Sequence, residues 1–333
     1  MTLRYLSTSD VERCLLEVDV VASVRGVLAA HHRGETIIPD EAYLAWPGES
    51  RARSINMPGY IGGPVPVAGT KIINANPANI TTGRRRAAGL TVLFDLATAA
   101  PTVVMDAAPV SAARTAAVST LAGELFADRP RRLCLLGCGT VGAAHVVMMS
   151  ARLSTLAEVI VYDIDPSRAE AFVANSGSRL ATNVATSAEA AVSGADLIIA
   201  TTTATQSYIP RAWLGPGSVT VNVSLDDLDS DALLECDMLF VDDWHLVRSD
   251  QRRLLGRLAA EGRVSGPGDP PRAGARRVDA ELGAVIVGAH PGRTGADQVV
   301  VVNPFGVSIE DLGVAQAVAE IADRLGLGLP LEN

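Results

Sequence analysis

A short apolar run, residues 133–136, is followed directly by three glycines in the spacing GxGxxG. In a dinucleotide-binding fold, the first glycine permits the turn out of a strand and the second lets the backbone approach a pyrophosphate. The third lets the next helix pack closely on the sheet. Gly137, Gly139 and Gly142 occupy these three positions, so the turn predicts a site for a phosphate-bearing cofactor.

The residues after this turn support the same interpretation. Residues 143–153 predict a helix and residues 158–162 a second strand, which ends at Asp163. A carboxylate at that place holds the ribose hydroxyls of the cofactor and repels the 2′-phosphate of NADP, so it favours NAD. Arg168 is close enough to weaken this preference. The alternative is a Rossmann-like fold that has lost its cofactor.

Length and composition restrict the class of protein. A chain of 333 residues exceeds the usual size of a single core, so two domains are expected. The net charge of −9 argues against nucleic acid as a partner, and the short cluster Arg84, Arg85 and Arg86 does not reverse this. The composition is typical of a cytoplasmic α/β protein, and the sequence indicates neither export nor a membrane span.

The cysteines and histidines do not predict a metal site. The four cysteines have no metal-ligand spacing, and the five histidines form no HxH or HxxxH pair. Cys134 and Cys138 lie in the predicted strand and glycine turn, where they are expected to be small apolar residues of a reduced protein.

Hydrophobic periodicity predicts two different regions. Residues 10–30 predict a helix capped by Ser9 or Asp10, and the next part alternates short β-like runs with Gly/Pro turns, which is typical of an antiparallel sheet. These runs are residues 54–57, 65–74, 89–95 and 101–105.

A helix over residues 111–126 then leads into the glycine turn. Further apolar strands alternate with helices or loops, as in a doubly wound parallel sheet. They are predicted at residues 196–200, 218–223, 238–241 and 298–302, before a last helix over 309–325.

The fold class expected is therefore α/β, with a Rossmann domain inserted in a discontinuous α+β domain. The Rossmann domain comprises residues 115–303, and the substrate-binding and dimerisation domain residues 1–114 and 304–333. Residues 262–277, rich in Gly, Pro and Arg, form either a mobile surface loop or a lid that brings a cation over an acidic substrate.

Several motifs together resemble the ornithine cyclodeaminase/mu-crystallin family over nearly the full chain. Besides the glycine turn they are Met57-Pro58-Gly59, Gly69-Thr70-Lys71 continuing into residues 74–79, residues 113–117, and Gly306 with Ile309-Glu310-Asp311. The resemblance implies an NAD(P)-dependent homodimer that acts on amino or imino acids. It also implies that Lys71 and Arg114 engage the substrate carboxylate.

The residue types agree with that role. A lysine within an apolar strand is costly to bury unless an anion pairs with it, and a guanidinium is a natural bidentate partner of a carboxylate. Nothing nearby in sequence neutralises Arg114. The alternative for Lys71 and Arg114 is an internal ion pair with Asp95 or Asp106.

Two departures from the family pattern bear on the reaction. Cyclodeaminases resemble one another in having an acid shortly before Met-Pro and an Asp-Ser-x-Gly turn before the last helix. Here these positions hold Ile55 and Asn303, so groups that would move protons in ring closure are absent and ornithine cyclisation is disfavoured.

The chain looks closest to the branch of the family that serves 2,3-diaminopropionate biosynthesis. The motifs are residues 60–63, 241–244, 280–283, 303–306 and the terminal Leu-Gly-Leu-Gly-Leu-Pro-Leu. This resemblance implies oxidation of a secondary amine that carries three carboxylates. NAD takes the hydride, and water releases 2-oxoglutarate and 2,3-diaminopropionate from an imine.

The site residues follow from these motifs and the resemblance. Lys71 is the expected catalytic residue and also binds substrate, together with Arg53, Arg86, Arg114 and Asn303; Arg51 is an alternative to Arg53 and Arg86. Asp242 and Asp243 end a strand on the carboxyl side of the sheet, where ligands bind, or else are solvated turn acids. Thr201 and Thr202 follow a strand that the cofactor would pass, or else only end it. The residues expected to bind the cofactor are Arg114, Thr115, Gly137, Gly139, Thr140, Val141, Gly142, Asp163, Thr201, Thr202 and Asp242.

Two other functions remain open at this point. One is a cyclodeaminase or a ketimine or imino acid reductase, and the other is a protein that binds NAD(H) and a small ligand without turnover. The apolar region from residue 61 to residue 73 also predicts a twofold dimer in which the sheets of the substrate domains face each other.

Overall fold

The computed structural model describes residues 3–48, 52–175 and 180–332; Arg51 lies outside them. Its contacts divide the chain into two compact units. We call residues 1–114 with 307–333 the discontinuous unit, and residues 115–306 the inserted unit. The sequence places the second boundary after residue 303, whereas the contacts place it after residue 306.

An eight-stranded mixed sheet forms the discontinuous unit, in the order β18-β1-β7-β6-β5-β4-β2, with β3 also paired to β4. The strands β4 to β7 are antiparallel, as their alternating pattern predicts, whereas β1 joins β7 in parallel. The strands are β1 (Leu3–Leu6), β2 (Thr36–Ile37), β3 (Ala42–Ala45), β4 (Arg53–Ile61), β5 (Val67–Ala75), β6 (Ala87–Phe94), β7 (Pro101–Asp106) and β18 (Leu329–Leu331). A 3₁₀ turn, η1 (Pro77–Thr82), connects β5 to β6.

The single helix predicted over residues 10–30 is wrong, because the chain forms α1 (Thr8–Leu15) and α2 (Val20–His32) there. Asp19 begins the second helix by accepting a hydrogen bond from the backbone N–H of Ala22 at 3.0 Å. The cap of the first helix is Ser7, which forms a capping box with Asp10. The apolar pattern continues through both helices, and the capping groups decide where one ends and the next begins.

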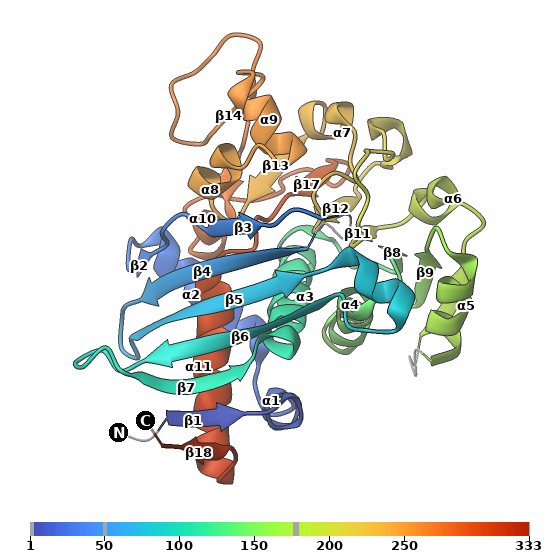
Figure 1. The fold of residues 1–333 in the computed structure, drawn as a ribbon. Helices are drawn as coiled ribbons and strands as arrows, with labels where there is room; N and C mark the ends of the chain where they lie inside the picture. The colour runs from blue at the N-terminus through green and yellow to red at the C-terminus, as the bar shows by residue number, and fades with distance from the viewer. Residues whose placement is uncertain (1–2, 49–51, 176–179, 333) are drawn as a thin grey trace. The chain divides into compact units, whose positions relative to one another are not determined.

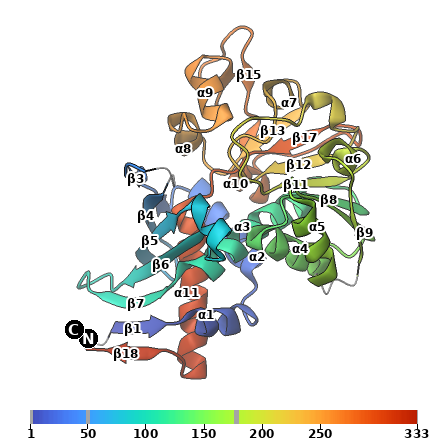
Figure 2. The same ribbon diagram turned by 45° about the vertical axis from the view of Figure 1, so that its right-hand side comes forward.

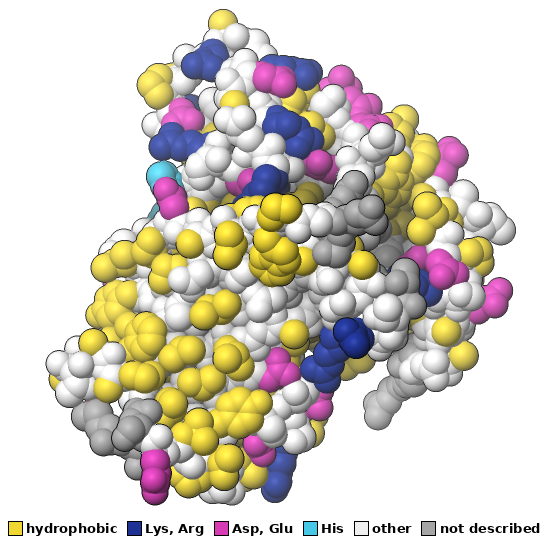
Figure 3. Space-filling model, in the orientation of Figure 1, with side chains coloured by type: hydrophobic (Ala, Val, Ile, Leu, Met, Phe, Trp, Pro, Cys, Tyr) yellow, Lys and Arg dark blue, Asp and Glu magenta, His cyan; other side chains and the backbone are white. Residues whose placement is uncertain are grey.

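The two faces of this sheet differ. Helix α11 (Ser308–Leu325) packs on one face of β4, β5 and β6 and runs behind them in Figure 1. On the other face, hydrophobic side chains gather over β4 to β7 (Figure 3). Ile72 and Leu90, directly opposite each other on β5 and β6, are 37% and 43% exposed. This apolar face of the sheet is not covered by any of the described residues.

The inserted unit contains an eight-stranded sheet in the order β10-β9-β8-β11-β12-β17-β13-β16, and every pair in it is parallel. Its central strands are buried along their whole length, which explains why most of them are uninterrupted apolar runs. The strands are β8 (Arg132–Leu136), β9 (Glu158–Tyr162), β10 (Ala181–Val184), β11 (Leu197–Ala200), β12 (Val219–Asn222), β13 (Met238–Val241), β16 (Ala280–Glu281) and β17 (Val300–Val302). This is the predicted doubly wound Rossmann sheet (Figures 1 and 2).

Helices connect these strands. The first, α3 (Ala107–Phe126), starts in the discontinuous unit and continues into the inserted unit. The others are α4 (Thr140–Arg152), α5 (Pro166–Asn175), α6 (Ala188–Val192), α7 (Ser230–Leu234), α8 (Trp244–Ser249), α9 (Leu254–Ala260) and α10 (Leu282–Ile286), with the 3₁₀ turn η2 (Arg211–Trp213). None of the helices in the described part of the chain is long and apolar enough to cross a membrane.

The Gly/Pro/Arg-rich segment 262–277 is partly ordered by its own contacts. Its ends pair as two short parallel strands, β14 (Val264–Ser265) and β15 (Arg276–Arg277). Asp269 in its middle accepts hydrogen bonds from the Trp244 indole at 3.1 Å and from the backbone N–H of Gly266 at 2.7 Å. These bonds tie the segment to the first residue of α8.

Candidate functional site

The glycine turn lies between β8 and α4, and two of its glycines are required by contacts within the unit. Gly137 has a φ of +93°, which L side chains rarely adopt. A Cβ on Gly142 would lie 2.5 Å from the carbonyl oxygen of Gly137. These two residues therefore set the shape of the turn.

Gly139 differs from them, because a Cβ built there would meet no protein atom within 4 Å. It is exposed and is the N-cap of α4, where no side chain accepts a hydrogen bond from the first backbone N–H groups. The start of a helix carries partial positive charge and free donors, which suit a phosphate. The space over Gly139 thus fits a dinucleotide pyrophosphate, and Thr140 and Val141 follow at the opening of the turn.

Asp163 contacts the glycine turn, and its role in binding the ribose stays a prediction. It follows β9, and its Oδ2 accepts a hydrogen bond from the backbone N–H of Cys138 at 2.9 Å. Its Oδ1 accepts one from the N–H of Asp165 at 3.0 Å. Burial and the charge of Asp163 raise the pKa of the Cys138 thiol to about 12, so this thiol is neutral at physiological pH. The carboxylate is held where a ribose-binding acid belongs in this fold.

Thr201 and Thr202 follow β11, and both hydroxyls already bind protein groups. The Thr201 hydroxyl donates to the carbonyls of Leu136 and Gly137, each at 3.0 Å, and so holds the glycine turn in place. The Thr202 hydroxyl donates to Asp227, a fully buried acid that also receives the hydroxyl of Tyr208 at 2.9 Å. Asp227 was not predicted, because no motif marks it.

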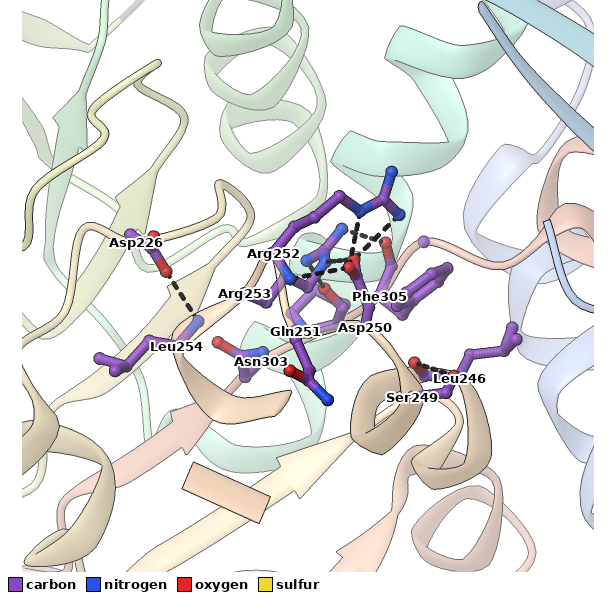
Figure 4. A network of polar contacts seen from close by, with 12 residues as sticks. Asp226, Leu246, Ser249, Asp250, Gln251, Arg252, Arg253, Leu254, Asn303 and Phe305 are labelled. Atoms are coloured by element: carbon purple, nitrogen blue, oxygen red, sulfur yellow. Dashed lines mark hydrogen bonds and ion pairs between the residues drawn. The ribbon is translucent and has the colours of Figure 1, made fainter. Parts of the chain in front are cut away.

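The turn 303–306 is held by two charged side chains, Arg253 and Asp242. Figure 4 shows Arg253 beside Phe305. Arg253 donates to the carbonyls of Pro304 at 3.1 Å and Phe305 at 2.8 Å, and its guanidinium carbon lies 4.8 Å from the centre of the Phe305 ring. Asp242 accepts from the backbone N–H groups of Phe305 at 2.7 Å and Gly306 at 2.6 Å.

The prediction that Asp242 binds the cofactor does not agree with its position. Asp242 is fully buried, and a third backbone N–H, that of Asp243, donates to it at 2.8 Å. Burial raises its pKa, while these backbone donors oppose the change. We correct its role to a structural one, and likewise that of Asp243, which caps α8 by accepting from the N–H of Leu246 at 2.7 Å.

Asn303 ends β17 and is nearly fully buried. Its side-chain oxygen accepts a hydrogen bond from the Asn222 amide at 2.7 Å, across the carboxyl ends of the neighbouring strands β12 and β17. Ligands of open parallel sheets bind at these strand ends. The side chain that Asn303 places at these strand ends is a neutral amide.

Lys71 and Arg114, the predicted carboxylate-binding residues, lie together in the discontinuous unit. The Lys71 ammonium contacts Asp311 Oδ2 at 2.5 Å. Arg114 contacts the same oxygen through Nε at 3.2 Å, and Glu310 Oε2 through Nη1 at 3.0 Å. All four side chains are at least nine-tenths buried. We call Lys71, Arg114, Glu310 and Asp311 the charge cluster.

The internal ion pair is thus real, but its predicted partners are wrong. Asp106 instead contacts Thr8 and Arg85, and Asp95 accepts hydrogen bonds from Thr98. Burial lowers the pKa of Lys71, and the charge of Arg114 adds to this, while Asp311 opposes it. A lysine in this state can exchange a proton nearer to neutral pH than a surface lysine can.

Arg53 and Arg86 form a second cationic region of the same unit. Burial lowers the pKa of Arg86, and so does the charge of Arg53. Directly opposed residues of an antiparallel pair point to the same side, and Met57 lies opposite Lys71. Arg53, four residues before Met57 on β4, therefore shares the sheet face of Lys71, about 13 Å away along the strand.

Thr115 follows Arg114 on α3 and is half-buried at the start of the inserted unit. Glu310 and Asp311 belong to one of the family motifs, but the sequence did not predict their contact with Lys71 and Arg114. Two adjacent acids at the start of a helix with apolar neighbours could have indicated a buried charge pair. Within the described residues, no group of three or more His, Cys, Asp and Glu side chains could hold a metal ion.

Fold and turn together define an α/β protein with a Rossmann-type dinucleotide-binding unit inserted in a mixed-sheet unit. Residues 4–324 match the ornithine cyclodeaminase/mu-crystallin family. The chain belongs to this family, which confirms the resemblance found in its motifs.

Three relatives define the comparison further. N-((2S)-2-amino-2-carboxyethyl)-L-glutamate dehydrogenase of Staphylococcus aureus is 30% identical over 98% of this chain and 97% of that protein. The crystal structure of CmnK superposes with a TM-score of 0.92 at 36% identity, covering 99% of this chain and 98% of that one. The Δ1-pyrroline-2-carboxylate reductase of Thermococcus litoralis, solved with NADH and L-proline, has a TM-score of 0.87 at 22% identity, covers 99% and 100%, and shows the shared fold.

Proposed function

We propose that this protein is an NAD-dependent amino acid dehydrogenase that cleaves N-((2S)-2-amino-2-carboxyethyl)-L-glutamate oxidatively. The substrate, NAD⁺ and water give 2-oxoglutarate, 2,3-diaminopropionate, NADH and a proton. The observation that carries the proposal is the 30% identity to the S. aureus dehydrogenase along nearly the whole of both chains. The names of that relative and of the NADH-bound neighbour are the source of the substrate and cofactor.

The glycine turn and its neighbours supply the cofactor site in this proposal. These residues would hold NAD, which would supply the hydride acceptor for oxidation at the glutamyl Cα to an imine between the two amino acid parts of the substrate. The N-terminus of α4 over Gly139 holds the pyrophosphate, and Asp163 accepts the ribose hydroxyls. Thr201 acts indirectly, by fixing the carbonyl groups of the turn.

The discontinuous unit supplies the counter-charge for a substrate with three carboxylates. Lys71 and Arg114 bind one carboxylate, and Arg53, on the same sheet face, binds a second together with the neighbouring Arg86. Positioning is the largest contribution of these residues to the rate. Because its pKa is lowered, Lys71 also moves the proton when water adds to the imine.

A cyclodeaminase reaction fits this chain less well. Ring closure and ammonia loss need acids that act on the amino groups, and Ile55 and Asn303 stand at the two positions. The side-chain oxygen of Asn303 moreover accepts a hydrogen bond from Asn222. Imino acid reduction remains the second candidate, since mouse ketimine reductase mu-crystallin is 30% identical over 68% of this chain.

We also propose that two copies pair through the uncovered sheet face. Ile72, Leu90, Val92, Phe94 and Val104 lie on that side, opposite to the side covered by α11. Burial of apolar surface is the main driving force of such association. Sedimentation at micromolar concentration should show a dimer, and a monomer would contradict this part of the proposal.

The activity is tested by incubating the purified protein with NAD and the proposed substrate, with L-ornithine in a parallel reaction. We expect NADH and 2-oxoglutarate to appear together, from the first substrate only. Proline and ammonia formed from ornithine, without net NADH, would show that the protein is a cyclodeaminase. NADH binding without turnover of any N-substituted amino acid would indicate a binding protein.

A further inference from the structure

Lys71 is the only lysine in the chain, whereas all other residues among its 28 lysines and arginines are arginine. This single lysine is also almost completely buried, at the middle of β5. An arginine cannot be deprotonated in a protein, but a lysine amine can, and its charge state then depends on its surroundings. The chain therefore places its one titratable amine where the neighbouring residues decide its protonation.

Three charged groups act on Lys71. Asp311 contacts it from α11, Arg114 acts on it from α3, and so does Glu41, just before β3. Glu310, also on α11, contacts Arg114. The neighbours of Lys71 across β4 and β6 are Met57 and Thr91, which carry no charge. The nearest charged group to the ammonium is Asp311, at 2.5 Å.

Asp311 contacts both cations with one atom. Its Oδ2 lies 2.5 Å from Lys71 Nζ and 3.2 Å from Arg114 Nε, and Glu310 contacts the other end of the guanidinium. Two cations buried side by side repel each other, so in the absence of an anion the lysine would lose its proton. Asp311 is the group that offsets this repulsion.

A simpler role for two acids in the first turn of a helix is to interact with the helix dipole. The contacts argue against that as their main role. Asp311 Oδ1 has no hydrogen-bond partner within the described residues, and the contacts of Oδ2 are with Lys71 and Arg114. The carboxylate is thus directed at the two cations.

We propose that Asp311 is a positioning residue of the substrate site: its Oδ2 bridges Lys71 and Arg114, sets their spacing and keeps Lys71 as an ammonium ion able to bind a carboxylate. Glu310 fixes the guanidinium from the other side and has a smaller effect on Lys71. The part of this inference that concerns catalysis rests on the proposed function. The part that concerns the charge of Lys71 does not.

Because the chain has one lysine, labelling with lysine that carries ¹³C at Cε and ¹⁵N at Nζ gives signals from Lys71 alone. We would follow their chemical shifts with pH in the full-length protein, with and without NADH. In the Asp311→Asn variant, the pKa of Lys71 should fall by at least about one unit, because an opposite charge at this distance favours the ammonium. In Glu310→Gln the fall should be smaller.

Asp323→Asn is the matched control, since Asp323 lies in the last turn of the same helix and pairs with Arg4. It should leave the Lys71 titration unchanged. If Asp311→Asn does not fold, Asp311→Glu is the second variant, because it keeps the charge but displaces it. The pKa of Lys71 should then lie below its value in Glu310→Gln and above that of a buried amine with no anion beside it. A Lys71 pKa that is the same in wild type and in every folded position-311 variant would overturn the inference.

Turnover provides the second readout. KM for the amino acid substrate should rise at least about tenfold in Asp311→Asn, more than kcat falls, and Asp311→Glu should partly restore it. If the wild type does not turn over the proposed substrate, the proposed function fails while the titration still decides the role of Asp311. If turnover is normal and the titration does not respond to position 311, only this inference fails.

Discussion

The glycine turn of the inserted unit and the charge cluster of the discontinuous unit are built in opposite ways. The turn is a contiguous stretch whose geometry depends on backbone atoms close by, such as the Gly137 carbonyl beneath Gly142. The cluster joins Lys71 on β5, Arg114 on α3 and two acids on α11, and 240 residues separate Lys71 from Asp311. In the proposed function, cofactor recognition is therefore local in sequence, whereas the charge balance around Lys71 and Arg114 is not.

This difference also affects how each region tolerates change. The open space over Gly139 leaves room for small side chains, at a cost to ligand binding rather than to folding. The cluster is buried, and removal of one member leaves an uncompensated charge inside the protein, which costs several kcal/mol. Substitutions in the turn can therefore change ligand binding without changing stability. Substitutions in the charge cluster should change both.

The largest effect is expected for Lys71→Met. Loss of the ammonium removes a carboxylate partner and the proton-transfer group, so kcat/KM should fall on the order of 10²–10³-fold. Arg85→Met is the control, because Arg85 is an exposed cation near Asp106. NADH affinity, measured by fluorescence titration, should be unchanged in both. Wild-type turnover by Lys71→Met would remove Lys71 from the mechanism.

Acid should weaken the inserted unit through His145, which joins α3 to α4. Its Nε2 is 2.9 Å from the Ser119 hydroxyl, its Nδ1 is 2.8 Å from the Val141 carbonyl, and burial lowers its pKa to about 4. The unfolded chain binds this proton near pH 6.5 and the folded one does not, so stability is complete above pH 6.5. It should decrease by about 3 kcal/mol as the pH falls toward 4.

Denaturant unfolding at several pH values measures this decrease. His145→Gln should flatten the curve in that pH range, whereas the exposed His245→Gln should not. An unchanged pH dependence in His145→Gln would assign the acid sensitivity to other groups.

Two glycines of the same turn provide a matched pair. Gly142→Ala forces a Cβ against the Gly137 carbonyl and should lower the free energy of unfolding by about 1–3 kcal/mol. Gly139→Ala meets no protein atom, so it should leave the melting temperature unchanged while weakening NADH binding. Unchanged NADH affinity in Gly139→Ala would contradict the assignment of Gly139 to the pyrophosphate.

A smaller effect is expected at Asp163. Asp163→Ser removes the acceptor for the ribose hydroxyls, so NAD affinity should fall about tenfold, while NADP should bind better relative to NAD. Glu158→Gln, at the other end of β9 where it pairs with Arg132, serves as the control. Unchanged selectivity between NAD and NADP would exclude Asp163 from the ribose site.

The sequence predicted the elements that local patterns determine. The strands at 158–162 and 238–241 are confirmed, because buried parallel strands need continuous apolar runs that end at polar residues. The turn 303–306 could be noticed as a departure from the family, but its clamps Arg253 and Asp242 could not. They reach it from other elements, and neither residue carries a local signal of that role.

The acids of the charge cluster show the same limit. A buried lysine predicts that an anion must be near, but Asp95 and Asp106 were as acceptable as Asp311 until the fold placed α11 against β5. Which carboxylate approaches the cation depends on the packing of elements far apart in the chain. No spacing rule in the sequence contains that information.

The most direct test of the central claim follows the hydride itself. Substrate with deuterium at the glutamyl Cα, and substrate with deuterium on the diaminopropionate carbon bonded to the bridging nitrogen, would be oxidised separately and the reduced cofactor analysed by mass spectrometry. The account predicts deuterated NADH from the first substrate alone, together with an equal amount of 2-oxoglutarate. Deuterium transfer from the second substrate, or 2-oxoglutarate without any transfer, would contradict it.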